Sequence, residues 1–185
     1  MREFVQKSFI NQWRYSGGEI TDGIRAASVP PHAKTLAVHQ SKPMSAILTD
    51  MNKYSNNLIA RSVFLKLGGE HSGNSALQQA SSSVKRELAT AGVDTENLVL
   101  ENGSGLSRRE RVSANMLAQM LEKAYFSPFK QDFIDTLPIA GKDGTLKYRL
   151  KQAGPALRLK TGTLKDVRAL AGYWLGDKPM IVVVV

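Results

Sequence analysis

Two short motifs hold residue types that together could perform chemistry on a peptide. Ser55 and Asn57 form a Ser-x-Asn motif, and Lys160 opens a Lys-Thr-Gly motif at the end of an alternating apolar stretch. A lysine beside threonine hydroxyls can hold a carboxylate, and Gly162 leaves the strand face clear for the backbone of an extended peptide. Each motif alone also fits a simpler interpretation, a helix cap for the first and an exposed strand end for the second. The pair, in this order, is stronger evidence for a site than either motif by itself.

The composition excludes several other kinds of site. The chain has no cysteine, which rules out disulfides, thiol nucleophiles and thiolate metal sites. Its histidines, His32, His39 and His71, lack the spacing of a metal-binding motif. No apolar run approaches the roughly 18 residues that span a bilayer, and the first residues lack the apolar segment of a secretory signal. We therefore expect no metal and no cofactor.

Positive charge is concentrated in one part of the chain. The formal net charge is +9, and a large share of it lies between residues 142 and 168. Such an excess attracts anions, so a non-catalytic basic module that binds nucleic acid or an anionic surface is the alternative to an enzyme. No predicted helix presents a basic groove-reading face, which argues against a nucleic-acid partner. The basic residues are Lys142, Lys147, Arg149, Lys151, Arg158, Lys160, Lys165 and Arg168, opposed by Asp143 and Asp166.

The spacing of apolar residues predicts helices first and strands last. Helical spacing and caps predict helices over residues 4–15, 43–54, 57–67, 75–91 and 113–125, with a short one from 128. We expect strand and loop over 20–38, a short strand at 98–100, and a loop with one helical turn at 141–151. Alternation then predicts strands over 157–160, 167–175 and 180–185. This order predicts an α+β fold with an antiparallel sheet, and it places Ser55–Asn57 between two helices.

Three blocks of the chain, in order, resemble one enzyme family. Met51–Ala60, Glu101–Arg108 and Leu159–Leu164 are similar to class C penicillin-binding proteins, the D-alanyl-D-alanine carboxypeptidase/endopeptidases of the penicillin-binding protein 4 type. The resemblance covers the chain from about Leu36 to Val185 and implies a transpeptidase fold like that of serine β-lactamases. It also implies a peptidoglycan peptide stem as substrate, β-lactam antibiotics as ligands of the full-length protein, and a periplasmic location.

The resemblance also implies a mechanism. In this family a serine attacks the peptide carbonyl before the terminal D-alanine, which leaves as the free amino acid, and water then hydrolyses the acyl-enzyme without a metal. By similarity, Ser55 relays protons to the leaving amine, Asn57 orients the substrate amide and the nucleophile's lysine, and Lys160 supplies a cation that helps bind the substrate carboxylate. The strand along which the substrate lies is implied to comprise Lys160, Thr161, Gly162 and Thr163.

The family's nucleophile motif, Ser-x-x-Lys, does not precede Ser55 in this chain. Two such tetrapeptides occur later, at Ser82–Lys85 and Ser127–Lys130, in the wrong order relative to the other motifs. A motif stands only with its structural context, so we predict that neither is catalytic. We expect the nucleophile, and a signal peptide, to lie upstream of Met1, and the chain alone to be inactive.

The resemblance implies two regions. We expect residues 1–40 to be the return segment from domains that the family inserts between its first two motifs, and residues 41–185 to be the carboxyl-terminal part of the transpeptidase-like domain. The apolar run Ile181–Val185 is typical of a paired sheet strand, so we expect the domain to be truncated there. Exposed strand or helix surfaces would then favour self-association.

Overall fold

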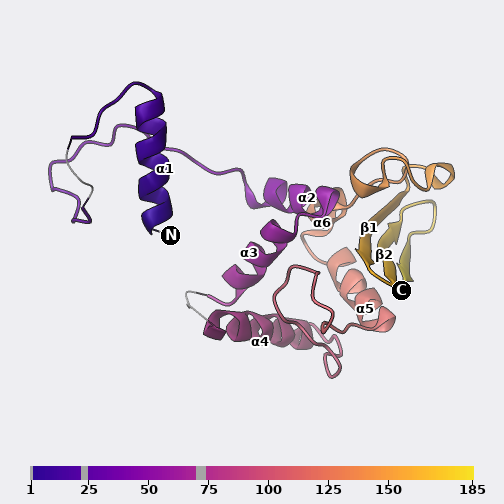
Figure 1. Cartoon of the computed structure of the whole chain (residues 1–185). Helices are drawn as coiled ribbons and strands as arrows, with labels where there is room; N and C mark the ends of the chain where they lie inside the picture. The colour runs from indigo at the N-terminus through magenta and orange to yellow at the C-terminus, as the bar shows by residue number, and fades with distance from the viewer. Residues whose placement is uncertain (1, 22–24, 70–73) are drawn as a thin grey trace. The chain divides into compact units, whose positions relative to one another are not determined.

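Helices precede strands along the chain, as the predicted α+β class requires (Figure 1). The computed structural model describes residues 2–21, 25–69 and 74–185. The chain divides into two units, Met1–Gln40 and Ser41–Val185. None of the described helices is long and apolar enough to cross a bilayer.

The first unit consists of one helix followed by a segment without regular hydrogen bonding. Helix α1 (Arg2–Tyr15) carries Phe9 and Trp13 one turn apart, with their rings stacked at a centroid distance of 6.1 Å. The strand expected within residues 20–38 is absent from the described part of this unit, and residues 22–24 of that range lie outside it. Leu36 and Val38 are 97% and 76% exposed. Their alternation was a misleading signal, because a strand needs a hydrogen-bonding partner to be stable.

The helices of the second unit follow the predicted order. They are α2 (Met44–Tyr54), α3 (Asn57–Leu67), α4 (Asn74–Thr90), α5 (Ala114–Tyr125) and α6 (Lys130–Thr136). Helix α6 begins two residues later than expected, because the Ser127 hydroxyl accepts the Phe129 N–H at 3.2 Å in a turn before it. The predicted strand at 98–100 is a single bridge between Val99 and Arg111. The single turn expected at 141–151 becomes two short 3₁₀ helices, η1 (Gly144–Leu146) and η2 (Lys151–Ala153).

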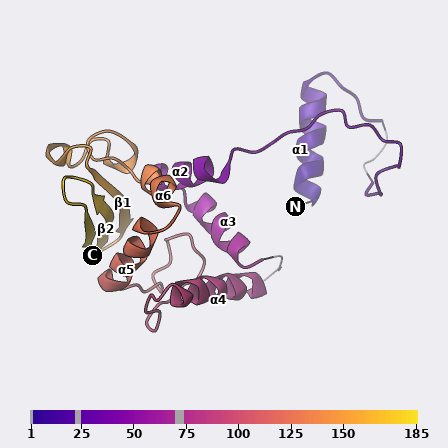
Figure 2. The same cartoon turned by 180° about the vertical axis from the view of Figure 1, so that it is seen from behind.

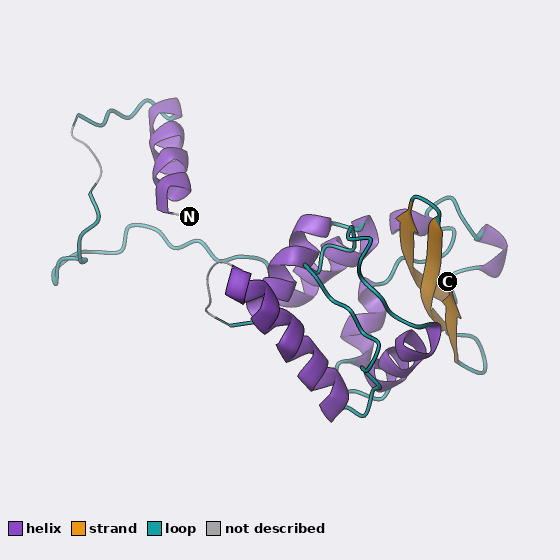
Figure 3. Cartoon of the chain, turned by 60° about the horizontal axis from the view of Figure 1, so that its bottom comes forward, coloured by secondary structure: helices purple, strands orange, loops and turns teal. Residues whose placement is uncertain are grey.

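A three-stranded antiparallel sheet completes the second unit (Figure 3). Its strands are β1 (Leu157–Leu164), β2 (Val167–Trp174) and β3 (Met180–Val184), in the order β1-β2-β3. The predicted meander is therefore confirmed. Among the described residues no further strand pairs with the outer edge of β3.

Both faces of the sheet bury apolar side chains, and this packing holds β1 in a fixed orientation. On one face, Tyr173 packs with Leu121, Ile134 and Leu137, beside α5 and α6 (Figure 2). The Tyr173 hydroxyl donates to the Leu121 carbonyl at 2.7 Å, and burial raises the pKa of Tyr173 to about 12, so the hydroxyl remains a donor.

The other face of the sheet lies under the segment that precedes β1. Leu157 and Leu159 pack there with Ala140 and Leu146. The alternation of β1 therefore buries Leu157 and Leu159 on one side and sends Lys160 to the opposite side.

A buried ion pair ties helix α2 to the segment between α6 and β1. Lys53 is only 8% exposed, and its Nζ donates to the Leu137 carbonyl at 2.6 Å and to the Asp143 carboxylate at 2.7 Å. The second oxygen of Asp143 accepts the Ile139 N–H at 2.7 Å. Gly144 lies so close that a Cβ there would be 2.6 Å from the Lys53 carbonyl oxygen, and its φ is +53°. This packing was not predicted, because lysine side chains are rarely buried.

We predict that Asp143→Ala lowers the free energy of unfolding by about 2 kcal/mol, because it leaves the Lys53 ammonium buried without its carboxylate. In a Lys53→Met background the same change should cost much less, since no charge is then stranded. Urea unfolding of the four variants of this double-mutant cycle measures the difference. An equal cost of Asp143→Ala in both backgrounds would show that the ion pair does not hold these segments together.

Candidate active site

Ser55 lies in a tight turn between α2 and α3. Its backbone adopts the left-handed conformation, with φ 52° and ψ 47°, and its N–H donates to the Met51 carbonyl to end α2. Asn56 then caps α3, because its side-chain oxygen accepts the Ile59 N–H at 3.0 Å. A left-handed non-glycine residue costs about 1 kcal/mol or more and persists only where its surroundings impose it. The two caps therefore hold the half-buried Ser55 side chain in one place.

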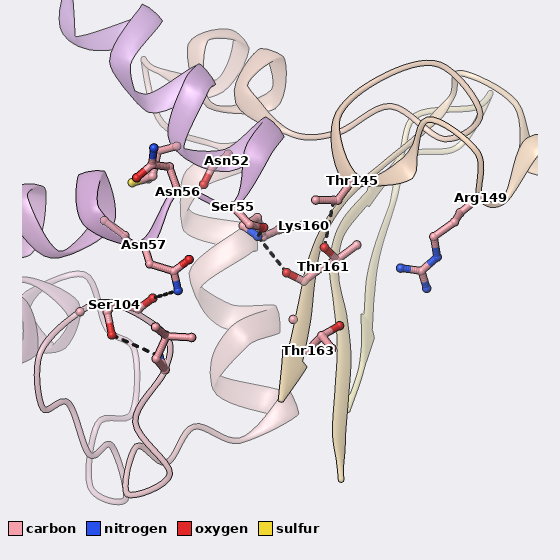
Figure 4. Close-up of a pocket in the computed structure, with 16 residues that line it drawn as sticks. Asn52, Ser55, Asn56, Asn57, Ser104, Thr145, Arg149, Lys160, Thr161 and Thr163 are labelled. Atoms are coloured by element: carbon pink, nitrogen blue, oxygen red, sulfur yellow. Dashed lines mark hydrogen bonds between the residues drawn. The ribbon is translucent and has the colours of Figure 1, made fainter. Parts of the chain in front are cut away.

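Lys160 joins the two motifs that are far apart in the sequence. Its Nζ donates to the Ser55 hydroxyl oxygen, 105 positions away, and to the Thr161 carbonyl at 2.8 Å (Figure 4). Burial lowers the pKa of Lys160 from its ordinary value of 10.5. A partly desolvated ammonium in contact with a hydroxyl stabilises negative charge on that oxygen and can exchange protons with it.

Asn57 connects the same site to a third segment. Its side-chain Nδ2 donates to the Ser104 carbonyl at 2.8 Å. The loop around Ser104 is ordered by its own side chains, since Asn102 accepts the Ser104 N–H at 2.9 Å and the Ser104 hydroxyl accepts the Leu106 N–H at 3.2 Å. The block at Glu101–Arg108 therefore forms part of the site wall.

One cavity of about 560 Å³ gathers all of the predicted site residues. They come from the α2–α3 junction on one side and from β1 on the other (Figure 4). The cavity lining includes Ser55, Asn57, Lys160, Thr161, Gly162 and Thr163.

Several polar residues of this cavity were missed by sequence reasoning. Ser104 lies in a block that was recognised but given no role. Thr145 accepts a hydrogen bond from the Thr161 hydroxyl at 2.9 Å, and Arg149 lines the same wall. Arg149 stood out only as one of eight basic residues, and nothing in its local pattern marks it as a site residue.

The two later Ser-x-x-Lys tetrapeptides do not line this cavity. Ser82–Lys85 lies within α4, and the Ser127 hydroxyl donates to the Ala124 carbonyl at 2.8 Å in the turn before α6. Within the described residues, no group of three or more His, Asp or Glu side chains could hold a metal ion. The cavity thus presents a lysine–serine pair, an amide and a strand edge.

This chain is similar to known carboxypeptidases. A family model, the D-Ala-D-Ala carboxypeptidase 3 (S13) family, matches residues 1–184. The D-alanyl-D-alanine carboxypeptidase of Actinomadura sp. (strain R39) is 37% identical over 153 residues, and the D-alanyl-D-alanine carboxypeptidase DacB of Haemophilus influenzae is 35% identical over 176 residues. These alignments cover 79% and 92% of this chain.

A solved structure shares the fold. Penicillin-binding protein 4 from Haemophilus influenzae, complexed with a β-lactam, superposes with a TM-score of 0.73 at 32% identity over 89% of this chain. The match confirms the predicted fold of helices and antiparallel sheet. The chain spans 28% and 36% of the lengths of the two relatives and 39% of the solved chain. With matching motifs, sequence and fold, this chain belongs to the D-Ala-D-Ala carboxypeptidase 3 (S13) family of serine peptidases.

Proposed function

We propose that this chain forms two walls of the active site of a serine-type D-alanyl-D-alanine carboxypeptidase/endopeptidase that acts on peptidoglycan peptides. One observation carries the proposal. Lys160 donates to the Ser55 hydroxyl inside a cavity that Asn57 also lines. Membership of a peptidase family favours this enzyme over the basic binding module.

Ser55, Asn57 and Lys160 are the proposed catalytic residues. The Lys160 ammonium keeps the Ser55 oxygen ready to accept and return a proton, which a leaving amine requires. One hydrogen of Asn57 Nδ2 holds the Ser104 loop, so its side-chain oxygen remains available to orient a substrate amide. Positioned donors in a partly desolvated site stabilise the transition state without reorganising during the reaction.

The edge strand β1 is the proposed support for the substrate backbone. It lies at one end of the sheet order, with β2 on its inner side. Its outer edge bonds to Pro138 and Ala140 over Leu157–Leu159, and the part that follows, Lys160–Thr163, lines the cavity. At Gly162 a Cβ would meet only the side chain and carbonyl of Ala169, so the strand presents little bulk there. An extended peptide can therefore pair with β1 beside Thr161 and Thr163, while Lys160 makes the surface positive.

The longer protein supplies the remaining parts in this proposal. Its nucleophile is a serine in a Ser-x-x-Lys segment upstream of Met1, and β-lactams acylate that serine. Residues 1–40 return the chain from inserted domains, and the protein resides in the periplasm. The greater length of the relatives leaves room for these parts, and the solved relative is a complex with a β-lactam. Where this chain stands alone, its exposed β3 edge favours self-association.

We predict that penicillin G forms a covalent adduct with the longer protein but none with residues 1–185 alone. Lys160→Met in the longer protein should slow acylation about 10²-fold, because one electrostatic contact with the reacting groups is lost. Intact-mass spectrometry gives the adduct, and its time course gives the rate.

Ser82→Ala and Ser127→Ala are the matched controls and should be acylated at the wild-type rate. A penicilloyl group mapped by peptide sequencing to Ser82 or Ser127 would overturn the assignment of the nucleophile to an upstream segment.

The lowered pKa of Lys160 predicts a pH dependence of stability. Between that lowered pKa and 10.5, the unfolded chain binds the proton that the folded chain has released, so the free energy of unfolding rises with pH. Lys160→Met should lack this contribution, and its stability relative to wild type should decline as the pH approaches 10.5. Urea unfolding of both proteins from pH 7 to 10.5 measures this difference. A constant difference across that range would mean that burial does not disfavour the Lys160 ammonium.

A further inference from the structure

Arg149 is a cation at the wall of the site that the mechanism above does not use. It lies between η1 and η2 and lines both the main cavity and an adjoining one of about 450 Å³. Gly162, Thr163 and Arg168 line the adjoining cavity as well. The Arg149 side chain points from its loop toward β1, where Thr161 and Thr163 lie (Figure 4).

Hydrogen bonds hold the backbone of Arg149 in place, whereas its guanidinium is available to bind a ligand. The Arg149 N–H donates to the Leu146 carbonyl at 3.0 Å, and its carbonyl accepts the Gly141 N–H at 2.9 Å. Within the described ranges, no carboxylate forms an ion pair with Arg149 or Arg168. A guanidinium presents planar paired N–H donors that match the two oxygens of a carboxylate.

The Lys160 ammonium already donates hydrogen bonds to two groups of the protein. Its Nζ donates to Ser55 and to the Thr161 carbonyl, which uses two of its three hydrogens. The Thr161 hydroxyl hydrogen is directed to Thr145. A ligand carboxylate on this side of β1 therefore needs a second cation, and Arg149 is the cation that shares a cavity wall with Thr163.

We propose that Arg149, assisted by the Thr163 hydroxyl, binds the terminal carboxylate of the acyl-D-alanine ligand and thereby selects chains that end in a free acid. Arg149 would be a specificity-determining residue, and Lys160 would serve chiefly the Ser55 hydroxyl. Arg168, which lines the adjoining cavity and is the cross-strand partner of Thr163, adds positive potential that favours the same ligand. This inference rests on the proposed function, since it concerns the substrate of that same site.

The test compares N-acetyl-D-alanyl-D-alanine with its C-terminal amide, each titrated into ¹⁵N-labelled chain and followed by NMR. We expect the acid to bind about tenfold more tightly than the amide and to shift the Gly162 and Thr163 resonances. Arg149→Gln should remove that preference and leave binding of the amide unchanged. Arg149→Lys should retain part of it, because the charge remains and the paired donor geometry is lost.

Lys147→Gln is the matched control, since it removes one charge from the same loop at an exposed residue that lines neither cavity. It should keep the wild-type preference for the acid. Retention of the full preference by Arg149→Gln, or loss of it in Lys147→Gln, would overturn the role of Arg149. Equal binding of acid and amide by the wild-type chain would overturn this inference alone. Failure to bind either ligand would count against the proposed function as well.

Discussion

The buried Lys53 ammonium holds together the two walls between which the site forms. It lies at the end of α2 and bonds to Leu137 and Asp143, both in the chain that leads from α6 into β1. Ser55 follows Lys53 by two residues, and Thr145 follows Asp143 by two residues. The same contact therefore sets the distance between the Ser55 turn and the loop that supports β1. If the bonds from Lys53 to Asp143 and Leu137 were lost, the charged Lys53 side chain would be stable only in contact with solvent, and the two walls could separate.

Two groups in the site lower the stability of the fold. Ser55 is held in a left-handed conformation, and Lys160 is partly desolvated without a carboxylate partner among the described ion pairs. The strained backbone of Ser55 and the burial of the Lys160 ammonium both lower the stability of the fold. Together they bring the Ser55 hydroxyl oxygen into contact with a cation. The sheet and helix packing around Tyr173 and Leu159 supplies the rigid support that keeps these strained groups in position.

The basic residues of this region divide into distinct roles once the fold is known. Asp143 looks in the sequence like a counter-charge for its basic neighbours, yet its carboxylate binds Lys53 from a distant helix. Arg158 pairs with Asp135 at 2.8 Å, again outside the stretch. Lys160 faces the Ser55 hydroxyl, and Arg149 lines the cavity beside Thr163. A charge total along the sequence cannot separate these roles, because each depends on which side chain lies opposite.

The sequence by itself predicted the helix positions within a few residues, the three-stranded meander, the family and a set of motif residues that all line one cavity. These follow from local signals: apolar spacing, capping residues such as Asn56 and Ser113, and short motifs whose chemistry is recognisable. The false strand near Leu36 arose from the same kind of signal, because alternation cannot show whether a partner strand exists. Only the tertiary structure decided that Lys53 is buried, that Lys160 meets Ser55, and that Arg149 lines the cavity. Those are contacts between segments far apart in the chain, and burial and electrostatic partners are properties of such contacts rather than of any single segment.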